Sequence, residues 1–86
     1  MARMEMAEAA LGGAAFSSDA FFELGMRHSV GNDGPVDLVA AHKWFNLAAM
    51  RGNAEATRLR REIADQMSEA DIAMAQREAR AWLKSH

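Results

Sequence analysis

Apolar side chains recur every three to four positions along most of this chain, which is the period of a helix that packs on one side. The stripe is clearest between residues 38 and 52, where its members are Leu38, Ala41, Trp44, Phe45, Leu47 and Ala48. Asp37 in front of the stripe can cap the first unpaired amides, and Gly52 behind it is a typical helix end. The pattern therefore predicts a helix that begins after Asp37 and closes at Gly52.

A second helix is predicted immediately before this one, from about Asp19 to Val30. The short side-chain oxygens of residues 17–19 can cap its start, and the sequence Gly31-Asn32-Asp33-Gly34-Pro35 forces a turn after it. An earlier helix is expected over residues 2–11, within an N-terminal helical segment that covers residues 1–16. The pair Gly12-Gly13 ends this first helix.

Two more helices are predicted in the C-terminal third. One begins after Asn53, a plausible cap, and stops near Ser68; its apolar positions are Ala56, Leu59, Ile63 and Met67. Ser68 with Asp71 is similar to a capping box for the last helix, whose apolar positions are Ile72, Ala75, Ala79, Trp82 and Leu83. Strong helix formers are abundant and alternating β-branched runs are missing. We therefore expect an all-α chain of four to five helices.

The length and the charge narrow the possibilities further. Residues 1–86 make a single small helical domain, which buries only roughly 60 to 65% of its unfolded surface, so a partner or a neighbouring copy could add stability. The chain has no cysteine, and packing must hold it together without disulfides. Ten basic and twelve acidic side chains give a formal charge of −2, which lacks the basic excess of a dedicated nucleic-acid binder.

No targeting or membrane-spanning segment is recognisable in the sequence. Glu5 and Glu8 interrupt the apolar residues near the start, so no window supplies the ~7 to 15 apolar residues of a signal peptide or the ~20 of a membrane span. We therefore expect a cytoplasmic protein without membrane contact. The initiating methionine favours a complete chain over a piece of a longer repeat array.

A set of small and aromatic residues in the two middle helices has a distinctive spacing. Its members are Ala20, Leu24, Gly25, Gly31, Ala41, Trp44, Ala48, Ala49 and Gly52. This register resembles the Sel-one-like repeat, a relative of the tetratricopeptide repeat, over residues 20–56. The resemblance implies an α/α helical hairpin over residues 19–52, as in a short solenoid. Gly25 and the alanines stand where two antiparallel helices approach closely.

The chain departs from the family's pattern near the turn of this hairpin and again after the hairpin. His28 stands where the first helix usually carries a tyrosine, and the turn reads Gly-Asn-Asp-Gly instead of Gly-x-Gly-Val. A second repeat should begin at Ala56, but Arg60 and Arg61 occupy the positions of its Leu-Gly pair. We therefore expect residues 54–84 to be capping helices that close the apolar end of the repeat.

Candidate catalytic and metal-binding groups are few. His28 and His42 could approach each other in an antiparallel hairpin, but no third ligand stands at a telling spacing, and His86 is terminal. We expect no enzyme activity, no cofactor and no metal, with His28 packed between helices in place of the tyrosine. The run Arg58–Arg61 has acidic residues at helical spacing, which favours intrahelical ion pairs over contacts with nucleic acid.

The seven methionines allow two interpretations, because flexible thioethers suit both variable partner surfaces and irregular cores. We favour core filling for the four methionines in predicted helices beyond the N-terminal segment. They are Met26, Met50, Met67 and Met74. Met1, Met4 and Met6 differ, because they lie on a short amphipathic segment whose apolar side needs a packing partner.

The function that the resemblance implies is a non-catalytic adaptor or scaffold that binds another protein or peptide segment. Family members tend to line their concave side with the first helix of each pair, so the candidate contacts are Phe22, Glu23, Met26 and Arg27. Phe21 stays open between core and surface. The alternative is a self-associating structural protein, a homodimer in which a second copy completes the repeat, because about three repeats are ordinarily needed for a stable stack.

Overall fold

The computed structural model describes residues 17–32 and 34–86, and this part of the chain is all-helical. Its helices are α2 (Ser18–Val30), α3 (Leu38–Met50), α4 (Ala54–Ala64) and α5 (Glu69–Ser85). The predicted all-α fold class is confirmed. The helix expected over residues 2–11 lies outside the described residues, as do Met1, Met4 and Met6.

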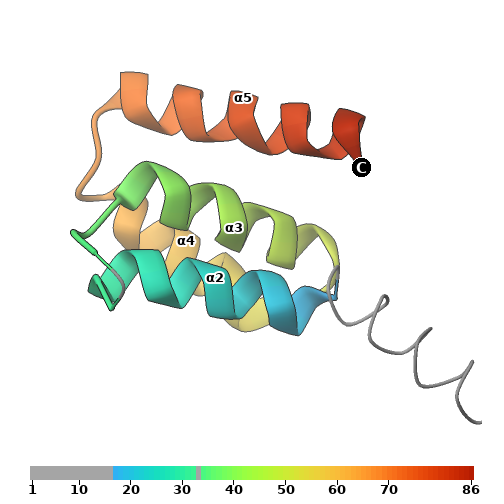
Figure 1. The fold of residues 1–86 in the computed structure, drawn as a ribbon. Helices are drawn as coiled ribbons and strands as arrows, with labels where there is room; N and C mark the ends of the chain where they lie inside the picture. The colour runs from blue at the N-terminus through green and yellow to red at the C-terminus, as the bar shows by residue number, and fades with distance from the viewer. Residues whose placement is uncertain (1–16, 33) are drawn as a thin grey trace, which may run out of the picture.

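α3 lies at the centre of the bundle. α2 runs antiparallel to it, and α4 and α5 pack against it from other sides (Figure 1). In this view α4 lies behind the α2–α3 pair, whereas α5 lies along the edge of α3 that faces away from α2. α4 and α5 have little contact with each other. The two C-terminal helices therefore cover α3 separately instead of pairing as a second hairpin.

Each described helix begins where the sequence supplies a short oxygen-bearing side chain. The side-chain oxygens of the four capping residues accept hydrogen bonds of 2.8–3.1 Å from the backbone amide three residues later. The caps are Ser17, Asp37, Asn53 and Ser68. These bonds satisfy amides that have no partner inside the helix. The predicted helix starts are confirmed.

The helices α2 to α4 end in two ways, at or near a glycine with a positive φ or in tight turns without one. Gly31 ends α2 with a left-handed φ of 74°, and its amide donates to the carbonyl oxygen of Arg27 at 3.0 Å. Gly52, with a φ of 97°, lies in the turn after α3. The predicted end of α4 near Ser68 is wrong, because the helix ends at Ala64. Tight turns replace helical bonds there: the amide of Gln66 donates to the Ile63 carbonyl at 2.9 Å.

The core is centred on α3 and combines large rings with small residues. Its buried apolar members are Phe21, Ala41, Phe45, Leu47, Ala48, Ala56, Ile63, Ala75 and Ala79. Alanines on α3, α4 and α5 let these helices approach closely, while the two phenylalanines and the leucine fill the remaining space. Phe21, which the sequence left open, therefore belongs to the core. Met67 lies in the turn after α4 and packs half-buried against the same cluster.

α2 and α3 approach each other closely at Gly25, which is buried against the ring of Phe45. A Cβ atom built on Gly25 would stand 2.5 Å from two carbons of this ring, far inside van der Waals contact. Phe45 is itself buried, and its ring packs on that of Phe22 with 5.7 Å between centroids. The ring therefore has little room to move aside.

A cluster of three aromatic rings attaches α5 to the helix pair. The Trp82 ring meets Phe21 edge-on with 5.1 Å between centroids, and it meets Trp44 edge-on at 6.1 Å. Phe21 and Trp44 stack at 5.9 Å. Such pairs each add about 0.5–1.5 kcal/mol beyond the burial of their area. The end of α5 is thus fixed to the beginning of α2 and to the middle of α3.

Gly25→Ala is expected to lower the free energy of unfolding by roughly 1–2 kcal/mol. An overpacked core costs about 1–3 kcal/mol, and an approach of 2.5 Å to a buried ring places the cost in the upper part of this range. The gain of about 1 kcal/mol that alanine has over glycine in a helix offsets part of it. Urea denaturation followed by circular dichroism measures the change. Gly34→Ala is the control, because no atom lies within 4 Å of its added Cβ, and it should be neutral or slightly stabilising. A Gly25→Ala chain as stable as the control would contradict the close contact.

Candidate functional site

The four predicted contact residues lie together on the outward side of α2. Glu23, Met26 and Arg27 are exposed, whereas Phe22 is half-buried because its ring packs against Phe45. The four side chains line one shallow hollow of about 650 Å³, together with Asp19 and Asn32. The structure therefore brings the four predicted residues together around one hollow. Phe22 connects this hollow to the core, because its ring also packs against Phe45.

A second hollow, of about 440 Å³, flanks the same helix on its other side and is lined by Ser17, Asp19, Ala20, Glu23, Leu24 and Arg27. Asp19, Glu23 and Arg27 line both hollows. Because they follow one another at intervals of four residues, they form a continuous ridge along the helix surface. We call these three residues the α2 ridge. The outward side of α2 is thus a charged ridge with a depression on either side.

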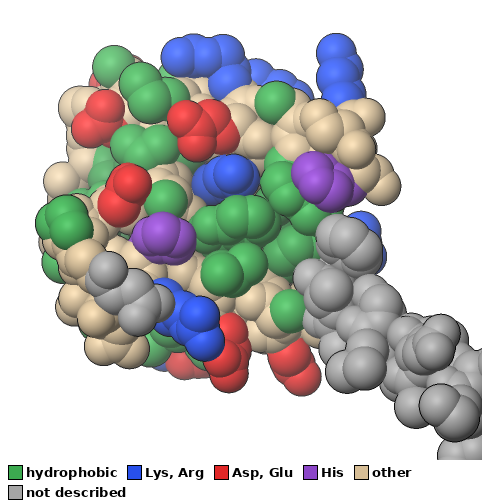
Figure 2. All heavy atoms as spheres, viewed as in Figure 1, with side chains coloured by type: hydrophobic (Ala, Val, Ile, Leu, Met, Phe, Trp, Pro, Cys, Tyr) green, Lys and Arg blue, Asp and Glu red, His purple; other side chains and the backbone are tan. Residues whose placement is uncertain are grey.

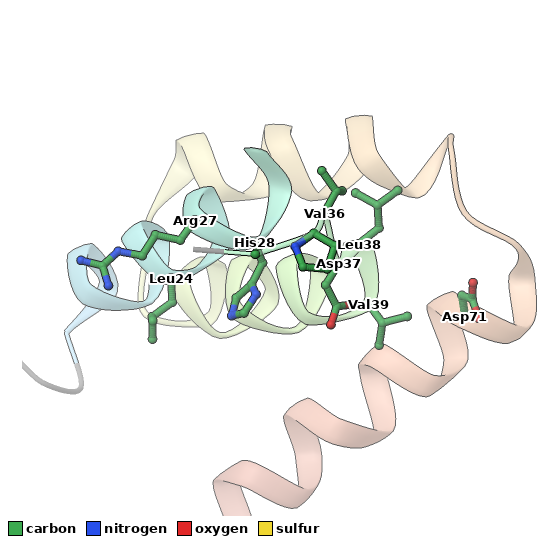
Figure 3. A pocket seen from close by; sticks show the side chains of 10 residues that line it. Leu24, Arg27, His28, Val36, Asp37, Leu38, Val39 and Asp71 are labelled. Atoms are coloured by element: carbon green, nitrogen blue, oxygen red, sulfur yellow. The ribbon is translucent and has the colours of Figure 1, made fainter. Parts of the chain in front are cut away.

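A more enclosed cleft of about 590 Å³ lies where α2 and the start of α3 face the beginning of α5. In Figure 3, Leu24, His28 and Val39 project to the same side, and Asp71 stands across from them on α5. Figure 2 shows hydrophobic side chains gathered over this face of the molecule, with acidic and basic groups among them. Arg27 lines this cleft as well as both hollows.

Three of the four methionines predicted to fill the core are exposed, so that prediction is wrong for them. Met26 is 37% exposed, Met74 41% and Met50 58%. Met26 and Met74 each stand beside the small residue that makes the helix contact, Gly25 in α2 and Ala75 in α5. A shift of one position turns a helical side chain by about 100°, which moves both methionines out of the interface.

His42 is deeply buried, with an exposed fraction of 3%, and its Nδ1 atom has no hydrogen-bond partner among the described residues. Burial lowers the pKa of His42 from the ordinary value of 6.5, and the positive charge of Arg60 lowers it further. The ring is therefore uncharged at neutral pH. His28, expected to pack between helices, is half-buried and lines the α2–α5 cleft.

The arginine run on α4 has two different uses. Arg58 pairs with Glu55 and Glu62 on its own helix, which confirms the predicted intrahelical ion pairs. The hydrogen bond from Arg58 lowers the pKa of the Glu55 carboxyl. Arg60 instead crosses to α3, where it donates to the Oδ1 atom of Asn46 at 2.5 Å. The spacing of charges along α4 gave no signal for this cross-helix bond.

Two absences concern the described part of the chain. It contains no group of three or more His, Cys, Asp or Glu side chains placed to hold a metal ion. None of its helices combines the length and apolar character that crossing a bilayer requires. Comparison with models of known families, with curated proteins and with solved structures gives no match. The case for a function therefore rests on the geometry around α2.

The free energy of unfolding is expected to fall as the pH drops below about 6.5, the ordinary histidine pKa. In this range the unfolded chain binds a proton at His42, whereas the folded chain, with its lowered pKa, binds it only at more acidic pH. The loss amounts to about 1.4 kcal/mol for each unit by which the pKa is lowered. Urea denaturation at several pH values between about 7.5 and 5 measures the slope.

His42→Leu should remove most of this pH dependence, because leucine fills a similar volume and does not titrate. His28→Leu is the control, since it also replaces a histidine of the helix pair by leucine and keeps His42 in place. The His42→Leu chain and the unmodified chain could instead lose stability with the same slope against pH. The buried neutral imidazole would then not be the source of the pH dependence.

Proposed function

We propose that this chain is a non-catalytic protein-interaction module, an adaptor or scaffold of the Sel-one-like kind, whose contact helix is α2. The observation that carries the proposal is the outward side of α2, where Phe22 and Met26 line a hollow edged by the charges of the α2 ridge. Peptide partners commonly place an apolar anchor in such a depression, while charged groups at the rim fix their direction.

The packing of the α2–α3 pair supports the kinship with Sel-one-like repeats. Several residues that carry the resemblance lie in the core or at a helix contact: Gly25 lies against Phe45, and Ala41 and Ala48 are fully buried. Gly31 takes the left-handed conformation that ends α2. A hairpin closed by these contacts leaves the other side of its first helix to face solvent, which is the side expected to meet partners.

The surroundings of the charged residues favour binding over catalysis. Asp19, Glu23 and Arg27 are exposed, and water screens charges at such positions. Catalytic acids and bases usually owe their activity to burial and to specific neighbours. Among the described residues, His42 is the buried polar side chain, and at 3% exposure its ring is closed off from any substrate.

Phe22→Ala combined with Met26→Ala is expected to reduce partner capture at least tenfold in an affinity pull-down from the native cell, followed by peptide identification. Truncating an anchor of this kind costs about 1 kcal/mol or more. Met50→Ala combined with Met74→Ala is the matched control, because it removes exposed apolar side chains from α3 and α5.

Phe22 also contacts Phe45, so circular dichroism must show that the double variant is folded. Met26→Asp changes only an exposed side chain and should reduce capture by itself. Retention of every captured protein by both α2 variants would refute the proposed contact helix.

A further inference from the structure

The α2 ridge changes sign along its length. Asp19 lies in the first turn of α2 and Glu23 in the second, whereas Arg27 lies in the last turn. Two such ridges placed antiparallel bring the acidic half of each against the basic end of the other. Parallel ridges would instead place like charges side by side, which is unfavourable. The order of charges along α2 is therefore complementary to itself under a twofold rotation.

The surface beside the ridge also has a hollow that the ridge of a second helix can enter. Ridges formed by residues four apart pack into the grooves of a second helix in the commonest class of helix contact. On α2 the ridge lies next to the hollow of Phe22 and Met26, so the ridge of one copy fits the hollow of another, and the reverse contact follows from the symmetry. This contact also covers Met26, and Val30, which is 55% exposed.

We propose that the partner of the α2 face is a second copy of this chain, bound antiparallel about a twofold axis. The inference rests on the proposed function, because it names the occupant of the same surface. Glu23 and Arg27 stand at equal distances on either side of Gly25 along the helix. A twofold axis that meets the outward side of α2 at the level of Gly25 therefore forms two contacts at once. Each contact joins Glu23 of one chain to Arg27 of the other.

The size of α2 sets the strength of this association. The helix has 13 residues and is roughly 20 Å long at 1.5 Å per residue. A single helix of this length buries less than the ~800 Å² per partner that is typical of a stable interface. The dimer is therefore a weak and reversible one. It supplies the α2–α3 pair with the neighbouring helices that a repeat hairpin needs.

Sedimentation velocity of the full chain from about 5 µM to 1 mM tests the proposal. The unmodified chain should shift from monomer to dimer across this range. Glu23→Arg and Arg27→Glu should each weaken the dimer at least tenfold, because like charges then meet twice across the axis. An equimolar mixture of the two variants should dimerise again, since positions 23 and 27 are then both positive in one chain and both negative in the other.

Glu78→Arg and Arg77→Glu, on exposed positions of α5, change the net charge equally and should leave dimerisation unaltered. Circular dichroism checks that every variant is helical. A chain that stays monomeric up to 1 mM would overturn the proposal, and so would a mixture of the α2 variants that associates no better than either alone.

The two proposals fail separately. If the unmodified chain is monomeric but the Phe22 and Met26 variants still lose a captured protein, the second copy is excluded and the contact helix stands. If the charge exchange behaves as described but those variants retain every captured protein, α2 pairs with a second copy, and α2 is excluded as the contact helix for other proteins.

Discussion

The contact between Gly25 and the ring of Phe45 sets the distance between α2 and α3, and the rest of the molecule depends on that distance. Once Gly25 faces inward, Phe21 lies one turn away on the same side, where it meets Trp82 of α5. The same rotation of the helix turns the α2 ridge outward. One missing methyl group thus decides both where the last helix attaches and which charges the molecule presents to a partner.

The contact at Gly25 matters beyond α2 because all three of the other described helices pack on α3. Its buried residues are apolar, and the buried His42 is the exception. An uncharged imidazole at this position costs less than a charged one, because burial penalises charge. The hydrogen bond from Arg60 to Asn46 lies at the same interface and holds α4 in register. The centre of the bundle is therefore apolar toward α2 and partly polar toward α4.

The helix starts were predictable because a cap is a local signal, and Ser17 and Asn53 need only their own next turn to act. The exposure of individual side chains was harder to predict. Met26 and Gly25 are adjacent in sequence, and the position of α3 decides that Gly25 is buried and Met26 is exposed. The bond between Arg60 and Asn46 joins two helices and has no sequence pattern at all. The hollow beside Phe22 was predicted as a set of residues, but its ridge became visible only when both flanks of α2 were known.

The meeting of Phe21, Trp44 and Trp82 also bears on how the chain folds and how that process can be followed. α2 and α3 are neighbours in sequence and need to close only a short loop, whereas α5 must return across the intervening α4 before its ring reaches them. Loop-closure entropy therefore favours the helix pair as the early structure and α5 as the late arrival. Both tryptophans of the chain lie in this one cluster, so its intrinsic fluorescence is an optical signal for the last step of assembly.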